Sequence, residues 1–172
     1  MPADETADPA HAAVRAHLDA IGAQYDVVAC DPELADTGAF CAAYGFAPED
    51  SANTILVVGK GGAGDGRIAA CVVLATTRLD VNRTVRNRLA SRKASFAGTD
   101  QTEASTGMTL GGVTAFGLPA AMPLWVDEHV MSRPRIVLGG GSRSWKVLCA
   151  PAELLRVDRA EVVPGLAHAL PG

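Results

Sequence analysis

The sequence lacks an apolar run of the length that a transmembrane helix requires, about 20 residues. Its first ten residues, MPADETADPA, are acidic, so the basic and apolar regions of a secretory signal peptide are missing too. Hydrophobic residues make up 48% and charged residues 20% of the 172 positions, which excludes a disordered chain. The length and these proportions predict a single domain over residues 1–172. Because neither a transmembrane run nor the regions of a signal peptide are found, we expect a protein of the cytoplasm without a membrane partner.

Paired cysteines are absent as well. The four cysteines, Cys30, Cys41, Cys71 and Cys149, are far apart, and none belongs to a C-x-x-C pair. Three of them have apolar neighbours in predicted strands or helices, where cysteine usually acts as a small buried hydrophobic residue. The spacing argues against a disulfide framework or a zinc site, and we expect neither a metal nor a cofactor.

Familiar catalytic and nucleotide-binding patterns are also missing. No G-x-S-x-G segment occurs, so a Ser-His-Asp triad has no support. Gly59, Gly61 and Gly64 fit G-x-G-x-x-G, but the dinucleotide fingerprint requires a helix after the loop, and an apolar strand follows here. We interpret this segment as a hairpin loop. Only His129 among the four histidines is expected near a cleft, and a surface position is the commoner one for such a residue.

Glycine, by contrast, is concentrated in two segments. Gly107 to Asp127 reads GMTLGGVTAFGLPAAMPLWVD, and GGGSR follows at residues 139–143. Because glycine lets the backbone approach another group closely, residues 111–114 could aim backbone N–H groups into a cleft. Amides placed in this way suit a carbonyl or anionic oxygen. The alternative is that both segments are ordinary turns between strands.

Hydrophobic periodicity and turn residues predict an α+β fold, because many strands alternate with a few short helices. Helices are expected at residues 9–21, 37–44, 81–90, 100–106 and 151–156, and strands at 24–30, 53–59, 67–75, 94–97, 123–126, 135–138 and 145–149. Asp100 and Glu103 are expected to form a capping box. The tail beyond Asp158 is rich in Ala, Val, Pro and Gly and is expected to pack loosely.

Three segments, GGVTAFGLP, LWVDE and VLGGGSRSWKV, follow one another at residues 111–119, 124–128 and 137–147. In this order they resemble the signature segments of the YbaK-type editing family, relatives of the editing domain of bacterial prolyl-tRNA synthetases that hydrolyse mischarged aminoacyl-tRNA. The resemblance covers about residues 26–156. It implies a curved, mixed sheet of six or seven strands, partly closed like a barrel, with helices packed outside.

The same resemblance implies a trans-acting aminoacyl-tRNA deacylase. Its expected partners are a mischarged tRNA and, as a further candidate, an aminoacyl-tRNA synthetase, and the protein is expected to be a monomer or a dimer. No general base is obvious in the sequence. The resemblance accounts for this, because in the family water is activated largely by groups of the substrate, including the terminal ribose hydroxyl.

The resemblance also assigns roles to individual residues. The implied catalytic positions are Asn53, Gly111, Gly112 and Thr114. The implied substrate-binding positions are Val113, Phe116, Asp127, Gly140, Gly141, Ser142 and Arg143. Two interpretations of Asp127 stay open, binding of the substrate amine or capping of the turn that follows. Arg143 is either a ligand for a tRNA phosphate or a solvated loop residue.

Asn53 is the main departure from the family pattern. Family members commonly carry lysine at the start of this strand, and deacylation depends on it, whereas the aligned stretch here reads ANTILVV. Asparagine donates and accepts hydrogen bonds but supplies no positive charge. Lys60 lies about 23 Å away along an extended strand and cannot easily substitute. A second hypothesis is therefore a catalytically weakened module that binds tRNA or an aminoacyl-adenosine-like ligand.

A basic segment runs from Arg78 to Lys93 and contains one acidic residue, Asp80. The net charge of −4 argues against indiscriminate coating of nucleic acid but leaves room for a local basic face. We predict phosphate contacts with the tRNA from Arg83, Arg86 and Lys93. The alternative is an ordinary solvated helix face.

Overall fold

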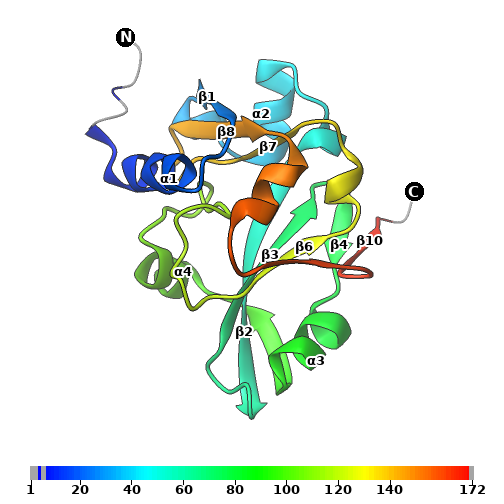
Figure 1. The fold of residues 1–172 in the computed structure, drawn as a ribbon. Helices are drawn as coiled ribbons and strands as arrows, with labels where there is room; N and C mark the ends of the chain where they lie inside the picture. Colours follow the sequence, from blue (N-terminus) through cyan, green and yellow to red (C-terminus); the bar gives the residue numbers. More distant parts are fainter. Residues whose placement is uncertain (1–3, 5–6, 171–172) are drawn as a thin grey trace.

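The chain folds into three β-sheets surrounded by short helices (Figure 1). The computed structural model describes residue 4 and residues 7–170. The helices are α1 (Pro9–Ala20), α2 (Thr37–Tyr44), α3 (Arg86–Leu89) and α4 (Thr99–Thr106). The strands are β1 (Tyr25–Ala29), β2 (Ala52–Gly62), β3 (Ile68–Leu74), β4 (Thr77–Leu79), β5 (Ser91–Phe96), β6 (Leu124–Asp127), β7 (Ile136–Gly139), β8 (Trp145–Cys149), β9 (Ala160–Val163) and β10 (Ala167–Ala169). In the described part of the chain, no helix is long and apolar enough to span a bilayer.

The largest sheet has five strands in the order β5-β2-β3-β6-β9. Strand β2 pairs antiparallel with β3 and β5, whereas β3, β6 and β9 run parallel to one another. The long β2–β3 hairpin dominates the lower half of Figure 1. Gly59 and Gly61 lie at the end of β2 and Gly64 lies in the turn that leads to β3, so the prediction of a hairpin is confirmed, although the strand extends further into the glycine segment than expected.

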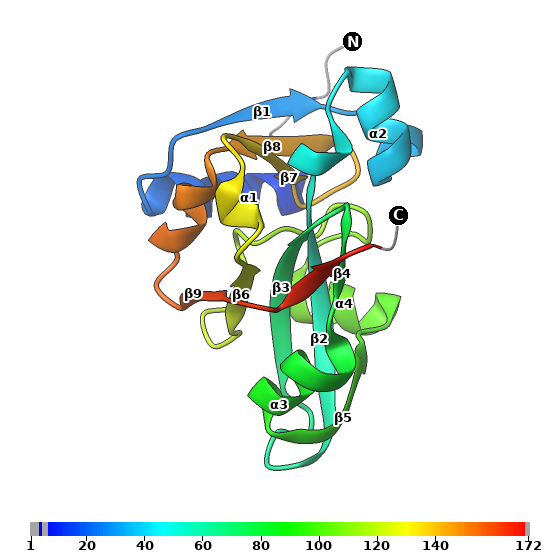
Figure 2. The same ribbon diagram turned by 90° about the vertical axis from the view of Figure 1, so that its right-hand side faces the viewer.

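The other two sheets are smaller. Strands β1, β8 and β7 form a three-stranded antiparallel sheet, and β10 pairs with β4 (Figure 2). One isolated bridge between Ser51 and Val137 joins the three-stranded sheet to the start of β2. The α+β class is confirmed, but the prediction of one sheet of six or seven strands is wrong. The described strands form no closed barrel, because a single bridge replaces a continuous ladder between the two larger sheets.

Side-chain alternation along β2 and β3 sends residues to two separate cores. On one face, Leu56 and Val72 pack in a cluster with Val14 and Leu18 of α1. The opposite face carries a second cluster that includes Val57, Cys71 and Leu89. A third cluster lies under α2 and joins Phe40 and Cys41 to Val137 and Leu148 of the three-stranded sheet. Helix α2 therefore covers the junction at which β2 meets β7 and β8.

The cysteines behave as the spacing indicated, since all four are free and buried. Burial raises the pKa of the Cys71 and Cys149 thiols to about 12, so neither forms a thiolate near neutral pH. These side chains fill the core.

Two local predictions are wrong. Helix α4 begins at Thr99 after Gly98, so Asp100 lies within its first turn and forms no capping box. The tail is not loosely packed, because β9 pairs with β6, β10 pairs with β4, and Leu166 is fully buried. The expected helix at residues 151–156 is a 3-10 helix, and a π-helical turn (Val81–Val85) precedes α3.

Candidate active site

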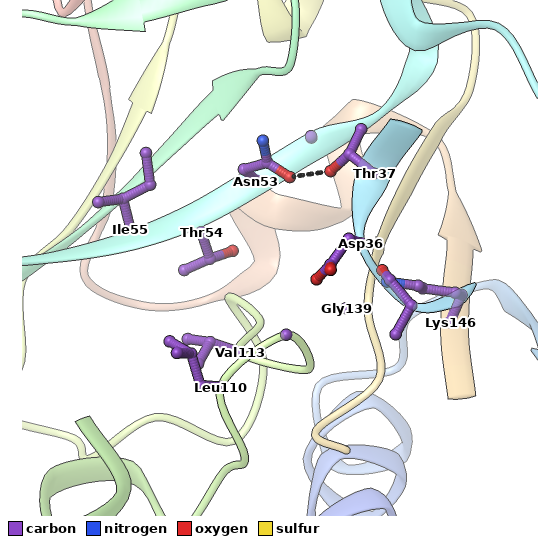
Figure 3. Close-up of a pocket in the computed structure, with 12 residues that line it drawn as sticks. Asp36, Thr37, Asn53, Thr54, Ile55, Leu110, Val113, Gly139 and Lys146 are labelled. Carbon is purple, nitrogen blue, oxygen red and sulfur yellow. Dashed lines mark hydrogen bonds between the residues drawn. The ribbon is translucent and has the colours of Figure 1, made fainter. Parts of the chain in front are cut away.

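A cavity of about 240 Å³ opens where α2, β2 and the two glycine segments meet (Figure 3). Figure 3 shows Asn53 and Thr37 on one side, Val113 and Leu110 on another, and Asp36 and Lys146 on a third. The full lining comprises Ala35, Asp36, Thr37, Ala52, Asn53, Thr54, Ile55, Leu110, Gly111, Val113, Gly139 and Lys146. Asn53, Gly111 and Val113 are the predicted site residues in this lining. We call this cavity the Asn53 pocket.

Strand β2 and helix α2 hold Asn53 in place. Helix α2 starts at Thr37, and the residue that follows its last turn, Gly45, ends it with a positive φ of 77°. The Thr37 hydroxyl donates a hydrogen bond of 3.0 Å to the side-chain oxygen of Asn53. The amide nitrogen of Asn53 is thus the end left to donate to a ligand. Thr54 also lines the pocket, and no residue of the described chain forms a hydrogen bond with its buried hydroxyl.

The two glycine segments interlock beside the pocket. The Gly141 N–H donates to the Gly112 carbonyl at 2.7 Å, and the Thr109 N–H donates to the Gly141 carbonyl at 3.0 Å. A Cβ atom at Gly112 would lie 2.6 Å from the Ser142 Cα. The backbones approach this closely only because side chains are absent.

These contacts decide which loop amides are available to a ligand. The Gly112 N–H donates to the Thr109 carbonyl at 2.8 Å, and the Gly141 N–H is used between the loops. The N–H groups of Gly111 and Val113 have no acceptor among the described residues, and both residues line the pocket. They are the backbone donors that a carbonyl or anionic oxygen could use.

Lys146 brings a buried charge to the same pocket. It lies on β8 with 8% of its surface exposed, and its Nζ donates a hydrogen bond of 2.7 Å to the carbonyl of Ala35. The same Nζ stands 5.3 Å from the centroid of the Phe40 ring. Burial lowers the pKa of the ammonium below its ordinary value of 10.5.

The aminoacyl-tRNA editing domain model matches residues 31–157, well over half of the chain. The chain belongs to this family. The match includes Asn53, both glycine segments and Lys146.

Solved structures share the fold of this editing domain. A protein proposed as a trans-editing enzyme for prolyl-tRNA synthetase superposes with a TM-score of 0.77 at 22% identity, over 91% of this chain and 96% of that one. The hypothetical protein APE2540 superposes with a TM-score of 0.80 at 21% identity, over 91% and 99% of the two chains. About nine tenths of the chain therefore shares the fold of these two proteins.

Several predicted site residues of the editing domain lie outside the Asn53 pocket. Thr114 and Phe116 are fully buried, and Phe116 belongs to the core cluster of α1. The Gly140 carbonyl accepts a hydrogen bond from His11, and the Ser142 hydroxyl donates to Asp8 at the start of α1. These residues hold the two glycine segments against α1 and the core.

Asp127 is not among the residues that line the Asn53 pocket. It is fully buried, and its Oδ1 accepts from the Ala167 N–H at 3.0 Å. Its Oδ2 accepts from the His129 N–H at 3.2 Å and lies 2.7 Å from the His129 ring nitrogen. Both carboxylate oxygens are therefore engaged away from the pocket, which favours the capping interpretation.

Arg143 contacts two residues of the pocket lining, Asp36 and Gly111. Its Nε donates to the Pro32 carbonyl at 2.9 Å, and its guanidinium forms an ion pair of 3.2 Å with Asp36. A Cβ atom at Gly111, where φ is 92°, would collide with this guanidinium. Arg143 is thus held against the first glycine segment and is not a freely solvated loop residue.

No histidine of the described chain lines the Asn53 pocket, His129 included, but the two histidines of α1 contact the glycine segments. His11 is fully buried, stacks on Trp145 at 4.8 Å and hydrogen-bonds the Gly140 carbonyl. His17 accepts a hydrogen bond of 2.7 Å from the Gly117 N–H, and burial lowers its pKa, which keeps the ring neutral. Helix α1 therefore anchors both glycine segments. Sequence spacing alone did not reveal which loops this helix contacts.

Lys146, Thr54 and Asp36 were missed as site residues. The sequence did carry one signal for Lys146, which is the single charged residue in the buried strand WKVLC. A lysine is rarely buried in such a strand unless its ammonium group has a partner.

Proposed function

We propose that this editing domain hydrolyses, in trans, the ester bond of a mischarged aminoacyl-tRNA. The observation that carries the proposal is the pair of unused N–H groups, on Gly111 and Val113, at the lining of the Asn53 pocket. Ester hydrolysis develops negative charge on the acyl oxygen, and backbone donors fixed in advance stabilise that charge. The volume of about 240 Å³ suits a small aminoacyl group better than a large one.

The deciding measurement is the rate of deacylation of tRNAs charged with alanine, cysteine, serine or threonine by the purified protein. We expect one mischarged pair to be hydrolysed well above the spontaneous rate, because pocket shape discriminates between small side chains by about 1 to 3 kcal/mol per methylene. Correctly charged prolyl-tRNA is the control and should persist. If no pair is hydrolysed although tRNA binds, the proposal is wrong.

A second candidate is a module that binds tRNA or an aminoacyl-adenosine-like ligand without turnover. The specific observation in its favour is Asn53, whose side-chain oxygen is already held by Thr37 and which carries no charge. The Asn53→Lys variant separates the two candidates in the same assay. Hydrolysis by the variant alone supports the module, whereas activity of the natural protein that the change leaves equal or lowers supports the enzyme.

We further propose that the basic segment around α3 contacts tRNA phosphates. Arg83 and Lys93 are exposed, Arg86 is half-buried, and none of the three forms an ion pair with a described carboxylate. A second cavity of about 640 Å³, lined in part by Arg78 and Phe96, shares Ile55 with the Asn53 pocket. The polar and aromatic side chains of this second cavity thus lie between the Asn53 pocket and the basic segment. A single strand of RNA that spans the two would contact them.

Replacing Arg83 and Arg86 together with alanine should weaken tRNA binding and reduce the slope of log Kd against log salt by about one to two units. The measurement is a salt titration of tRNA binding by fluorescence anisotropy. Arg135→Ala is the matched control, because Arg135 is an exposed arginine next to β7 that pairs with Asp26. An unchanged slope in the double variant would show that the segment is a solvated face.

A further inference from the structure

Lys146 is a buried cation that forms no ion pair in the described chain, although the Asp36 carboxylate lines the same pocket and acts on it from a distance. It is 8% exposed, and its recorded contacts are the Ala35 carbonyl and the face of the Phe40 ring. Removing an ammonium ion from water costs several kcal/mol unless another charge or a set of hydrogen bonds replaces the water. One carbonyl, one ring face and an exposed Asp36 carboxylate that already pairs with Arg143 leave much of that cost uncompensated. Such a site is completed by a ligand that brings negative charge.

The position of Lys146 indicates where that ligand lies. Lys146 lines the Asn53 pocket together with Gly111 and Val113, which offer the unused N–H groups. It also lines a small adjoining cavity that again includes Asn53 and Thr37. The residues that carry the buried charge and the free backbone donors therefore line one shared space.

We propose that the Lys146 ammonium contacts the acyl oxygen of the bound aminoacyl ester and stabilises the negative charge that forms there during hydrolysis. The water oxygen bonds to the carbonyl carbon, and the carbonyl π pair moves onto the acyl oxygen beside Lys146. That pair then returns as the bond from the carbonyl carbon to the ribose oxygen breaks. The proton lost by water ends on the ribose oxygen, which leaves a free amino acid and an uncharged tRNA.

This inference rests on the proposed hydrolase function and assigns a catalytic residue to it. The burial of Lys146 also has a chemical benefit, because a charge in a water-poor site interacts more strongly with a developing oxyanion than the same charge in water. The Ala35 carbonyl and the Phe40 ring fix the ammonium before the substrate arrives, so little reorganisation is needed during the reaction.

The first test measures binding and does not depend on turnover. One probe is the 3′ ester of adenosine with 1-aminoethylphosphonate, which carries a negative charge where the oxyanion forms. The other is the neutral amide analogue, 3′-alanylamino-3′-deoxyadenosine. We expect calorimetry to show that the natural protein binds the phosphonate about 100-fold more tightly than the amide, and that Lys146→Met removes this preference. An equal preference in the variant would overturn the inference.

The second test separates stabilisation of the acyl oxygen from binding of a tRNA phosphate. For a substrate that the natural protein hydrolyses, Lys146→Met should lower kcat about 100-fold with little change in KM. A rise in KM alone would assign the charge to a phosphate and overturn the inference. If the natural protein hydrolyses nothing, the proposed function fails, whereas the phosphonate comparison still decides the role of Lys146.

Two further variants distinguish the loss of the Lys146 charge from an effect of the substitution on folding. Lys146→Gln removes the charge but keeps an N–H donor for the Ala35 carbonyl, so it replaces Lys146→Met if that variant does not fold. Lys60→Met removes an exposed lysine from β2 and should change neither probe. The melting temperature of Lys146→Met should stay equal or rise, because the change removes an uncompensated buried charge. A purely structural lysine would give the opposite pattern, with a lowered melting temperature and an unchanged phosphonate preference.

Discussion

The Gly112→Ala variant will lose at least about 100-fold in kcat for deacylation. An added Cβ would stand 2.6 Å from the Ser142 Cα and closer still to the Ser142 carbonyl group. These are backbone atoms, so the collision cannot be relieved by a side-chain rotation. The two glycine segments must separate, which shifts the neighbouring N–H groups of Gly111 and Val113. Single-turnover deacylation of the mischarged tRNA by the purified variant measures the loss.

The same substitution should also lower the free energy of unfolding by about 1 to 3 kcal/mol, because it overpacks a closed contact. Gly38→Ala is the matched control. Gly38 lies in α2 with nothing within 4 Å of an added Cβ, so alanine should leave the rate unchanged and stabilise the helix slightly. A Gly112→Ala enzyme with the natural rate would contradict the assignment of catalytic donors to this loop.

The Asp127→Ala variant will be destabilised by about 2 to 4 kcal/mol while its folded fraction keeps the natural kcat and KM. The carboxylate is fully buried and accepts hydrogen bonds from the N–H groups of Ala167 and His129. Removing it leaves the buried Ala167 N–H without an acceptor, which costs about 1 to 3 kcal/mol, and the smaller remainder comes from the exposed His129, which also loses its partner. Urea unfolding gives the stability, and deacylation well below the melting temperature gives the kinetics.

Glu128→Ala serves as the control for Asp127, since Glu128 is the next residue along the chain and its side chain is exposed. It should change neither stability nor rate. If Asp127→Ala instead kept its stability and lost activity, the carboxylate would bind the substrate amine after all. That outcome would require movement of Asp127 toward the pocket, because its two oxygens are engaged elsewhere.

Local elements were predictable wherever neighbouring residues determine them. The spacing of Val14 and Leu18 with the stop at Gly22 predicted α1, and Gly45 correctly marked the end of α2. The apolar runs on both sides of the Gly59–Gly66 segment predicted the β2–β3 hairpin. Strands β9 and β10 escaped prediction because they form only with β6 and β4, which are distant in sequence. Composition carries no information about such partners.

The site was predictable only in part, for the same reason. Asn53, Gly111 and Val113 do line one pocket, although the contributions of the individual residues to hydrolysis stay predictions. In the sequence, Lys60 is the lysine at the other end of the same predicted strand, and distance along that strand is the one measure that sequence offers. Lys146 reaches the pocket from β8 of a different sheet, and only the packing of α2 across the sheet junction brings it there. Likewise, the contacts of His11 and His17 depend on where α1 docks.

The late strands have a consequence for biosynthesis. During translation β6 leaves the ribosome about 35 residues before β9, and β4 leaves about 90 residues before β10. Until residues 160–169 emerge, β6 and β4 each expose an unpaired edge, and the Asp127 carboxylate lacks the N–H of Ala167. The nascent domain is thus most vulnerable to edge-to-edge aggregation until residues 160–169 have left the ribosome, and chaperones that shield strand edges would act in that interval.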